Sequence, residues 1–154
     1  MSSDLWNFSL NTYALSGVQQ ACLQLQDAGA NVCLLLCGAW LGQRGVTCNE
    51  QRLQQLQELA TPWHREVIQP LRDLRIGWRA AACQDSDLHA LREQLKGLEL
   101  EAERQLLLRL QERSREWPDA QAGSLDDWLE GVAAEAAEGN RDALQVLRVA
   151  VSST

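Results

Sequence analysis

The chain has 154 residues, a formal net charge of -7 and a pI near 4.8. This length favours a single domain, and a hydrophobic content of 45% excludes a disordered or fibrous chain. The acidic balance lacks the basic surface that phosphate backbones require, and the acidic segment 117–154 would be repelled by an anionic membrane. We therefore expect neither nucleic acid nor a membrane as a partner.

Residues with a strong preference for helices dominate the composition. Leu occurs 27 times, Ala 19 times and Gln 16 times, whereas Val, Ile and Thr together occur 14 times. This bias predicts an all-α fold. We expect a single-domain closed bundle of seven or eight helices over residues 1–154, one of them long.

Three helices are predicted in the N-terminal part. The first begins near Asp4 and the second at Val18, with Gly29 placed to end the second. Asn31 is placed to cap a third helix, Val32–Gln43. The third helix has almost no polar face, which predicts a position at the centre of the bundle.

Prolines mark the middle of the chain. A helix is predicted after Asn49, and Thr61-Pro62 predicts the start of another that runs to about Cys83 with a bend at Pro70. Asp85 or Ser86 then caps the longest helix, which extends to about residue 116. Its apolar stripe, spaced as in a bundle helix, consists of Leu88, Leu91, Leu95, Leu98 and Ala102.

Two shorter helices are predicted at the C-terminal end, one after Ser124 and one after Gly139-Asn140. Trp117 and Trp128 flank the loop that precedes them. Either both pack in the core, or they are exposed anchors for a protein partner, since tryptophan is enriched at interface hot spots.

The chain contains five cysteines, Cys22, Cys33, Cys37, Cys48 and Cys83. The N-terminal residues show no secretion signal, so we expect reduced thiols in a cytoplasmic protein. No second cysteine pair or matching histidines accompany Cys33 and Cys37, which favours buried thiols over a metal site. The motif Asp85-x-Asp87-x-His89 lies at a helix start, where acidic caps are expected. We predict no metal and no cofactor.

Phosphate loops, nucleophile motifs and dinucleotide fingerprints are absent from the sequence. One set of charged residues remains, here named the charged cluster: Arg72, Arg75, Glu99 and Glu103. The two arginines share a helix face, and Glu103 has no basic residue three or four positions away. Three interpretations are open: pairing across a helix interface, a polar pocket for an anionic or metal-bridged ligand, or a solvated charged face.

The N-terminal segment resembles a known family. It carries the pattern Trp-x-Phe-Ser-Leu-x-x-Tyr at Trp6, Phe8, Ser9, Leu10 and Tyr13. Segments 70–75 and 99–104 are similar to later blocks of the same small proteobacterial family of uncharacterised proteins, so the resemblance extends to about residue 110. It implies an all-helical, cytoplasmic bacterial protein with no assigned activity.

These observations predict an interaction or accessory protein without chemistry of its own, as a monomer or homodimer. The alternative is a binding protein or enzyme for a small apolar or anionic ligand, held between the first three helices and the charged cluster. A cavity with unpaired arginines favours the ligand, and an exposed apolar patch at Trp117 or Trp128 favours a protein partner.

Overall fold

The computed structural model describes residues 4–119 and 125–152. Its α-helices are α1 (Leu5–Tyr13), α2 (Val18–Asp27), α3 (Val32–Gln43), α4 (Glu50–Trp63), α5 (Gln69–Gly77), α6 (Arg79–Ala82), α7 (Ser86–Arg113), α8 (Leu125–Ala133) and α9 (Arg141–Ser152). The predicted all-α fold is confirmed, and the only β pairing in these ranges is an isolated bridge between Val46 and Asp119. The predicted cap at Ser124 lies outside the described residues.

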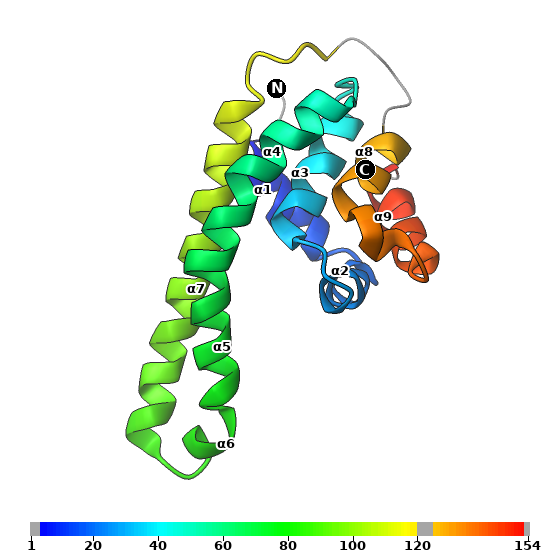
Figure 1. The fold of residues 1–154 in the computed structure, drawn as a ribbon. Helices are drawn as coiled ribbons and strands as arrows, with labels where there is room; N and C mark the ends of the chain where they lie inside the picture. The colour runs from blue at the N-terminus through cyan, green and yellow to red at the C-terminus, as the bar shows by residue number, and fades with distance from the viewer. Residues whose placement is uncertain (1–3, 120–124, 153–154) are drawn as a thin grey trace.

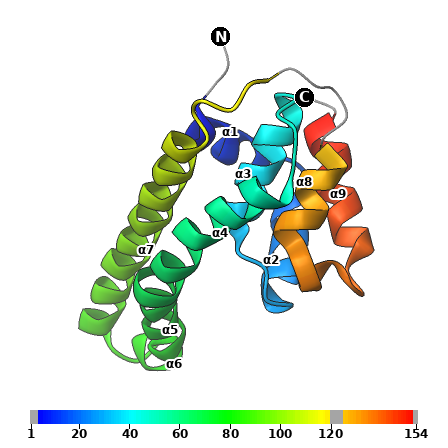
Figure 2. The same ribbon diagram turned by 45° about the horizontal axis from the view of Figure 1, so that its top comes forward.

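The helix α3 is the centre of the body, as its composition predicts. Ten of its twelve residues are buried, and α1, α2, α8 and α9 surround it together with one half of α7 (Figures 1 and 2). Asn31 caps the helix, because its side-chain oxygen accepts hydrogen bonds from the backbone N–H groups of Cys33 and Leu34. A helix without a polar face has to be enclosed on all sides.

Glycine allows α3 and α8 to approach each other closely. A Cβ atom on Gly42 would lie 2.6 Å from the Cα atom of Leu125, which is backbone and has little freedom to move. We therefore expect Gly42→Ala to lower the free energy of unfolding by about 1–3 kcal/mol. Gly97→Ala on α7 is the matched control: open space surrounds that position, so alanine should stabilise the helix by about 0.5–1 kcal/mol. Urea unfolding measures both, and stabilisation by both changes would contradict the close approach.

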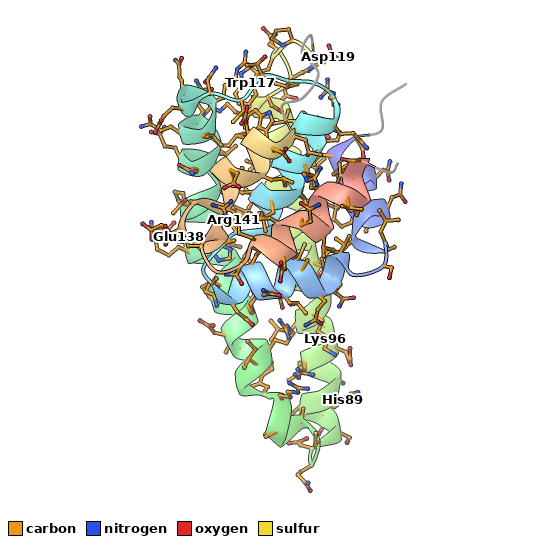
Figure 3. All side chains as sticks on the ribbon, turned by 90° about the vertical axis from the view of Figure 1, so that its right-hand side faces the viewer. His89, Lys96, Trp117, Asp119, Glu138 and Arg141 are labelled. Atoms are coloured by element: carbon orange, nitrogen blue, oxygen red, sulfur yellow. The ribbon has the colours of Figure 1, made fainter. Side chains whose placement is uncertain are left out.

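The second part of the fold is an arm that projects from the body. The helices α4 and α5 run side by side with α7, and the single turn α6 lies at the far end (Figure 1). The 28 residues of α7 make it about 42 Å long. His89 and Lys96 lie along the projecting part (Figure 3). Of the two predicted caps, Asp85 is the one that caps α7, because its side chain accepts hydrogen bonds from the N–H groups of Asp87 and Leu88.

The helix starts predicted from proline need correction. A new helix does not begin at Thr61-Pro62: α4 continues through Pro62, which removes only one hydrogen bond while the buried Leu56 and Ala60 keep the helix packed. A π-helical turn, His64–Ile68, connects α4 to α5 just before Pro70. The wider turn accommodates the proline ring, which would otherwise clash with the carbonyl four residues earlier.

The predicted apolar stripe of the long helix is only half buried. Leu95 and Ala102 are buried, but Leu91 and Leu98 are 52% and 56% exposed. The reason is that along the arm α7 packs on one side only, against the α4–α5 segment and α6, whereas a helix inside a bundle is covered on more than one side. The arm therefore presents apolar side chains that the fold itself does not cover.

Candidate functional site

The charged cluster lies where the arm joins the body, between α5 and α7. Arg72 Nε donates a hydrogen bond to Glu99 Oε2 at 3.2 Å, and Arg75 Nε donates to Glu99 Oε1 at 2.5 Å. Arg72 Nη2 lies 3.7 Å from Glu103 Oε1. Arg72 is 9% exposed and Glu99 is 6% exposed. The structure thus brings all four predicted residues together, and it agrees with pairing across the helix interface.

The two carboxylates of the cluster are in different electrostatic environments. Burial opposes the ionisation of Glu99, but hydrogen bonds from Arg75 and Arg72 outweigh it and lower its pKa below the usual 4.5. Burial raises the pKa of Glu103, and the charge of Arg72 offsets this only in part. Two arginines therefore balance the charge of Glu99, whereas that of Glu103 is balanced only in part, mainly by Arg72.

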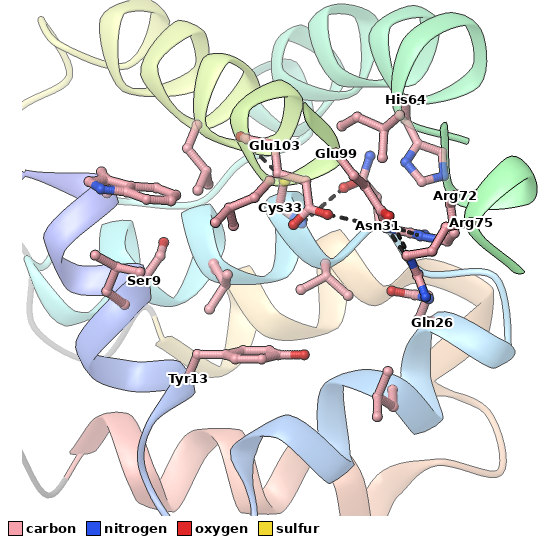
Figure 4. A pocket seen from close by; sticks show the side chains of 18 residues that line it. Ser9, Tyr13, Gln26, Asn31, Cys33, His64, Arg72, Arg75, Glu99 and Glu103 are labelled. Atoms are coloured by element: carbon pink, nitrogen blue, oxygen red, sulfur yellow. Dashed lines mark hydrogen bonds and ion pairs between the residues drawn. The ribbon is translucent and has the colours of Figure 1, made fainter. Parts of the chain in front are cut away.

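A pocket of about 230 Å³ opens beside the cluster (Figure 4). Its walls come from α1, α2 and α3 and, on the side of the arm, from the π-helical turn, α5 and α7. This is the position expected for a ligand, between the first three helices and the charged cluster. The apolar part of the wall includes Trp6, Leu36 and Leu107. The polar side chains outside the cluster are Ser9, Tyr13, Gln26, Asn31, Cys33 and His64. A cavity with unpaired arginines was the feature expected for a ligand-binding protein. The structure has the cavity, but its arginines are paired.

One buried polar group of the pocket, the hydroxyl of Ser9, is not satisfied by the described part of the protein. Ser9 is 4% exposed, and its Oγ has no hydrogen-bond partner within the described residues. A buried hydroxyl without a partner is costly, so such a group marks a place for a bound water or ligand. Tyr13 extends along the pocket from the same helix (Figure 4). Burial and the nearby Arg72 charge lower the pKa of His64, which keeps it neutral at pH 7.

Sequence reasoning missed these α1 residues as part of a site. Trp6, Ser9, Leu10 and Tyr13 recur at spacings of three and four, so they share one helix face. The sequence predicts a ligand between the first three helices and the charged cluster, but it singles out no residue of α1 as part of the site. The available signal was the hydroxyl of Ser9 in an otherwise apolar stripe.

The cysteines divide into buried and accessible thiols. Burial raises the pKa of Cys22 and Cys37 to about 12, raises that of Cys33 further, and raises that of the half-buried Cys48 to about 11. Cys83 is exposed. In a native thiol titration with a disulfide reagent we expect Cys83 to react first, because thiolate access controls the rate. Rapid reaction of more than two thiols before unfolding would contradict this burial pattern.

The tryptophans next to the C-terminal loop do not form an exposed pair. Trp128 is fully buried, its Nε1 donates to the carbonyl of Val46 at 2.7 Å, and its ring stacks on Trp117 at 6.1 Å. The interpretation of Trp128 as an exposed anchor is wrong, and core packing is correct. Trp117 is half-buried beneath the guanidinium group of Arg52.

The fold and site define an all-α protein with a projecting arm and a pocket beside a buried ion-pair cluster. The chain belongs to DUF2390, a family of proteins of unknown function, whose model matches residues 4–110. Every residue that lines the pocket falls within this segment, whereas α8 and α9 lie outside it.

Other comparisons add no relative to this family assignment. No curated protein and no solved structure matches the chain. Among the helices in the described ranges, none combines the length and hydropathy needed to cross a bilayer.

Proposed function

We propose that this protein binds a small molecule in the pocket beside the charged cluster and performs no chemistry on it. The buried Ser9 Oγ without a partner, next to a hollow, carries this proposal. The Ser9 hydroxyl can donate and accept hydrogen bonds but makes none within the described residues, and it lies at the wall of the pocket. A ligand that fills the pocket and forms a hydrogen bond with the hydroxyl would satisfy the buried polar group and gain packing contacts with the walls.

The pocket has the mixed lining that is typical of a ligand site. Trp6, Leu36 and Leu107 offer apolar contact, and a few polar groups on rigid helices fix the orientation of a ligand. Its volume of about 230 Å³ is small, which suits a compact molecule. Ser9 has no hydrogen-bonded base and the Cys33 thiol has a raised pKa, so neither side chain is activated as a nucleophile.

Nuclear magnetic resonance with a library of small fragments tests this proposal. We expect amide shifts to change at Ser9, Tyr13 and Cys33, and Val32→Trp at the pocket wall to abolish them. Val146→Trp on α9, away from the pocket, is the control and should behave as the wild type. Fragments that bind elsewhere, or bind equally to the Val32→Trp variant, would contradict the proposal.

A second candidate is an interaction protein that uses the exposed side of the arm. A shallow apolar groove of about 470 Å³ runs between α5 and α7, and Leu74 and Leu98 on its walls are 46% and 56% exposed. Its charged lining residues, Glu66 and Glu101, are both acidic. An amphipathic helix with basic residues beside its apolar stripe fits this groove.

Photo-crosslinking in the host cell tests the second candidate. A crosslinking amino acid at Leu98 should give a discrete adduct with a basic helical protein. The same amino acid at Lys96, an exposed position of α7 that does not line the groove, should not. Equal crosslinking from both positions would contradict binding in the groove.

A further inference from the structure

Hydrogen-bond donors are distributed unequally between the two carboxylates of the charged cluster. Glu99 accepts three hydrogen bonds, one from Arg72 and two from Arg75. Among the described side chains, the Glu103 carboxylate contacts one cation, Arg72, whose Nη2 lies 3.7 Å from Oε1, longer than an ordinary hydrogen bond. The carboxylate of Glu103 therefore has unused acceptor capacity at the pocket wall.

This distribution disfavours an anionic ligand. An anion could bind the arginines only by displacing Glu99. The buried carboxylate of Glu99 would then lose the hydrogen bonds that stabilise its charge. His64 offers no positive charge in its place, because its pKa is lowered. An anion would also face the charge of Glu103. The arginines of this pocket are thus already neutralised by the protein.

Two side chains of the pocket can accept further hydrogen bonds: Glu103 has only its long contact with Arg72, and the Ser9 hydroxyl has no partner within the described residues. Both favour a hydrogen-bond donor or a cation. Glu103 on α7 and Tyr13 on α1 face the pocket from different sides (Figure 4). The Ser9 Oγ is an additional acceptor. An ammonium group carries three donors, and an aromatic face such as that of Tyr13 adds cation–π attraction. The apolar wall then suits a hydrocarbon or aromatic body.

We infer that the pocket binds a small organic cation, an ammonium or amidinium group on a compact apolar body, with Glu103 as its counter-ion. This inference rests on the proposed function and names its ligand class. The sequence predicted an apolar or anionic ligand. A cation matches better the acceptor groups of Glu103 and Ser9 at the pocket wall.

Isothermal titration calorimetry with benzylammonium, benzyl alcohol and benzoate tests the ligand class, because the three probes have similar shapes. We expect benzylammonium to bind about tenfold more tightly than benzyl alcohol, as a charge-assisted hydrogen bond provides, and benzoate to bind most weakly. Glu103→Gln should remove the preference for the ammonium and retain the binding of the alcohol. Glu101→Gln, an exposed change on the same helix that lies outside the pocket, should keep the preference.

The possible results distinguish the claim that the pocket binds a small molecule from the claim that this molecule is a cation. Three results would contradict a cationic ligand while leaving the binding pocket in place. They are equal affinities for the ammonium and the alcohol, a preference for the ammonium that persists in Glu103→Gln, and tighter binding of benzoate. Binding of none of the three probes at millimolar concentration would contradict both claims. Ser9→Ala should weaken the binding of the ammonium and of the alcohol alike, because both probes contact this hydroxyl. Circular dichroism of each variant should match the wild type, which excludes unfolding as the cause of any loss.

Discussion

Replacing Glu99 with alanine should lower the free energy of unfolding by about 3–5 kcal/mol. The carboxylate compensates Arg72, which is 9% exposed, and also binds Arg75. Without it, a buried guanidinium group loses its hydrogen-bonded partner in a medium of low polarity. Urea unfolding at pH 7, followed by circular dichroism, measures this loss.

The control for this variant is Glu101→Ala, two residues along the same helix. Glu101 is half-exposed and pairs with Arg104 near the surface, so its loss should cost less than about 1 kcal/mol. The double replacement Arg72→Leu with Glu99→Leu should recover much of the stability, because it removes both charges. Similar losses for Glu99→Ala and Glu101→Ala would contradict the buried bridge.

The effect of Glu99 depends on pH in a defined direction. Its folded-state pKa lies below 4.5, so its stabilising contribution is present above the unfolded pKa and disappears as the pH falls through the folded value. The difference between wild type and Glu99→Ala should therefore shrink as the pH falls below 4.5. A difference that grows in acid would show that the carboxylate does not stabilise the fold as an ion.

Replacing Trp128 with alanine should cost about 3–5 kcal/mol, as expected for a large aromatic removed from a core. Its ring is fully buried against Trp117, and its Nε1 satisfies the carbonyl of Val46. Thermal and urea unfolding measure the change. Trp78→Ala, at a half-buried position near the end of the arm, is the control and should cost much less. A Trp128→Ala protein with wild-type stability would contradict the core assignment and favour an anchor for a partner.

Local patterns predicted much of the fold. Asn31 caps α3 as expected, and Asn49 and Asp85, each one of two candidates in the sequence, cap α4 and α7, because capping depends on neighbours along the chain. Gly29 ends α2 with a φ of 105°, a conformation that glycine adopts without strain. Pro62 was misleading because tertiary packing outweighs the loss of one hydrogen bond.

The arm could not be predicted, because the spacing of leucines says which face is apolar and not how many helices cover it. Leu91 and Leu98 keep bundle spacing and are nevertheless exposed. Periodicity describes a single helix, whereas the number of packing partners depends on the order of helices in space.

The charged residues of the site were predictable in part. The absence of a local basic partner for Glu103 indicated a contact with another helix, and Arg72 is that contact. The pocket was expected between the first three helices and the cluster, and a hollow lies there. Ser9 and Tyr13 were not predicted, because only the packing of α1 against α7 decides that a buried hydroxyl lacks a partner.

Native mass spectrometry of the protein, purified gently from its own host, tests the central claim most directly. We predict that the 17.2 kDa chain carries an additional mass that matches a small organic amine, and that the Val32→Trp variant does not. The bare mass for both proteins, or the same adduct on both, would contradict ligand binding in the pocket beside the charged cluster.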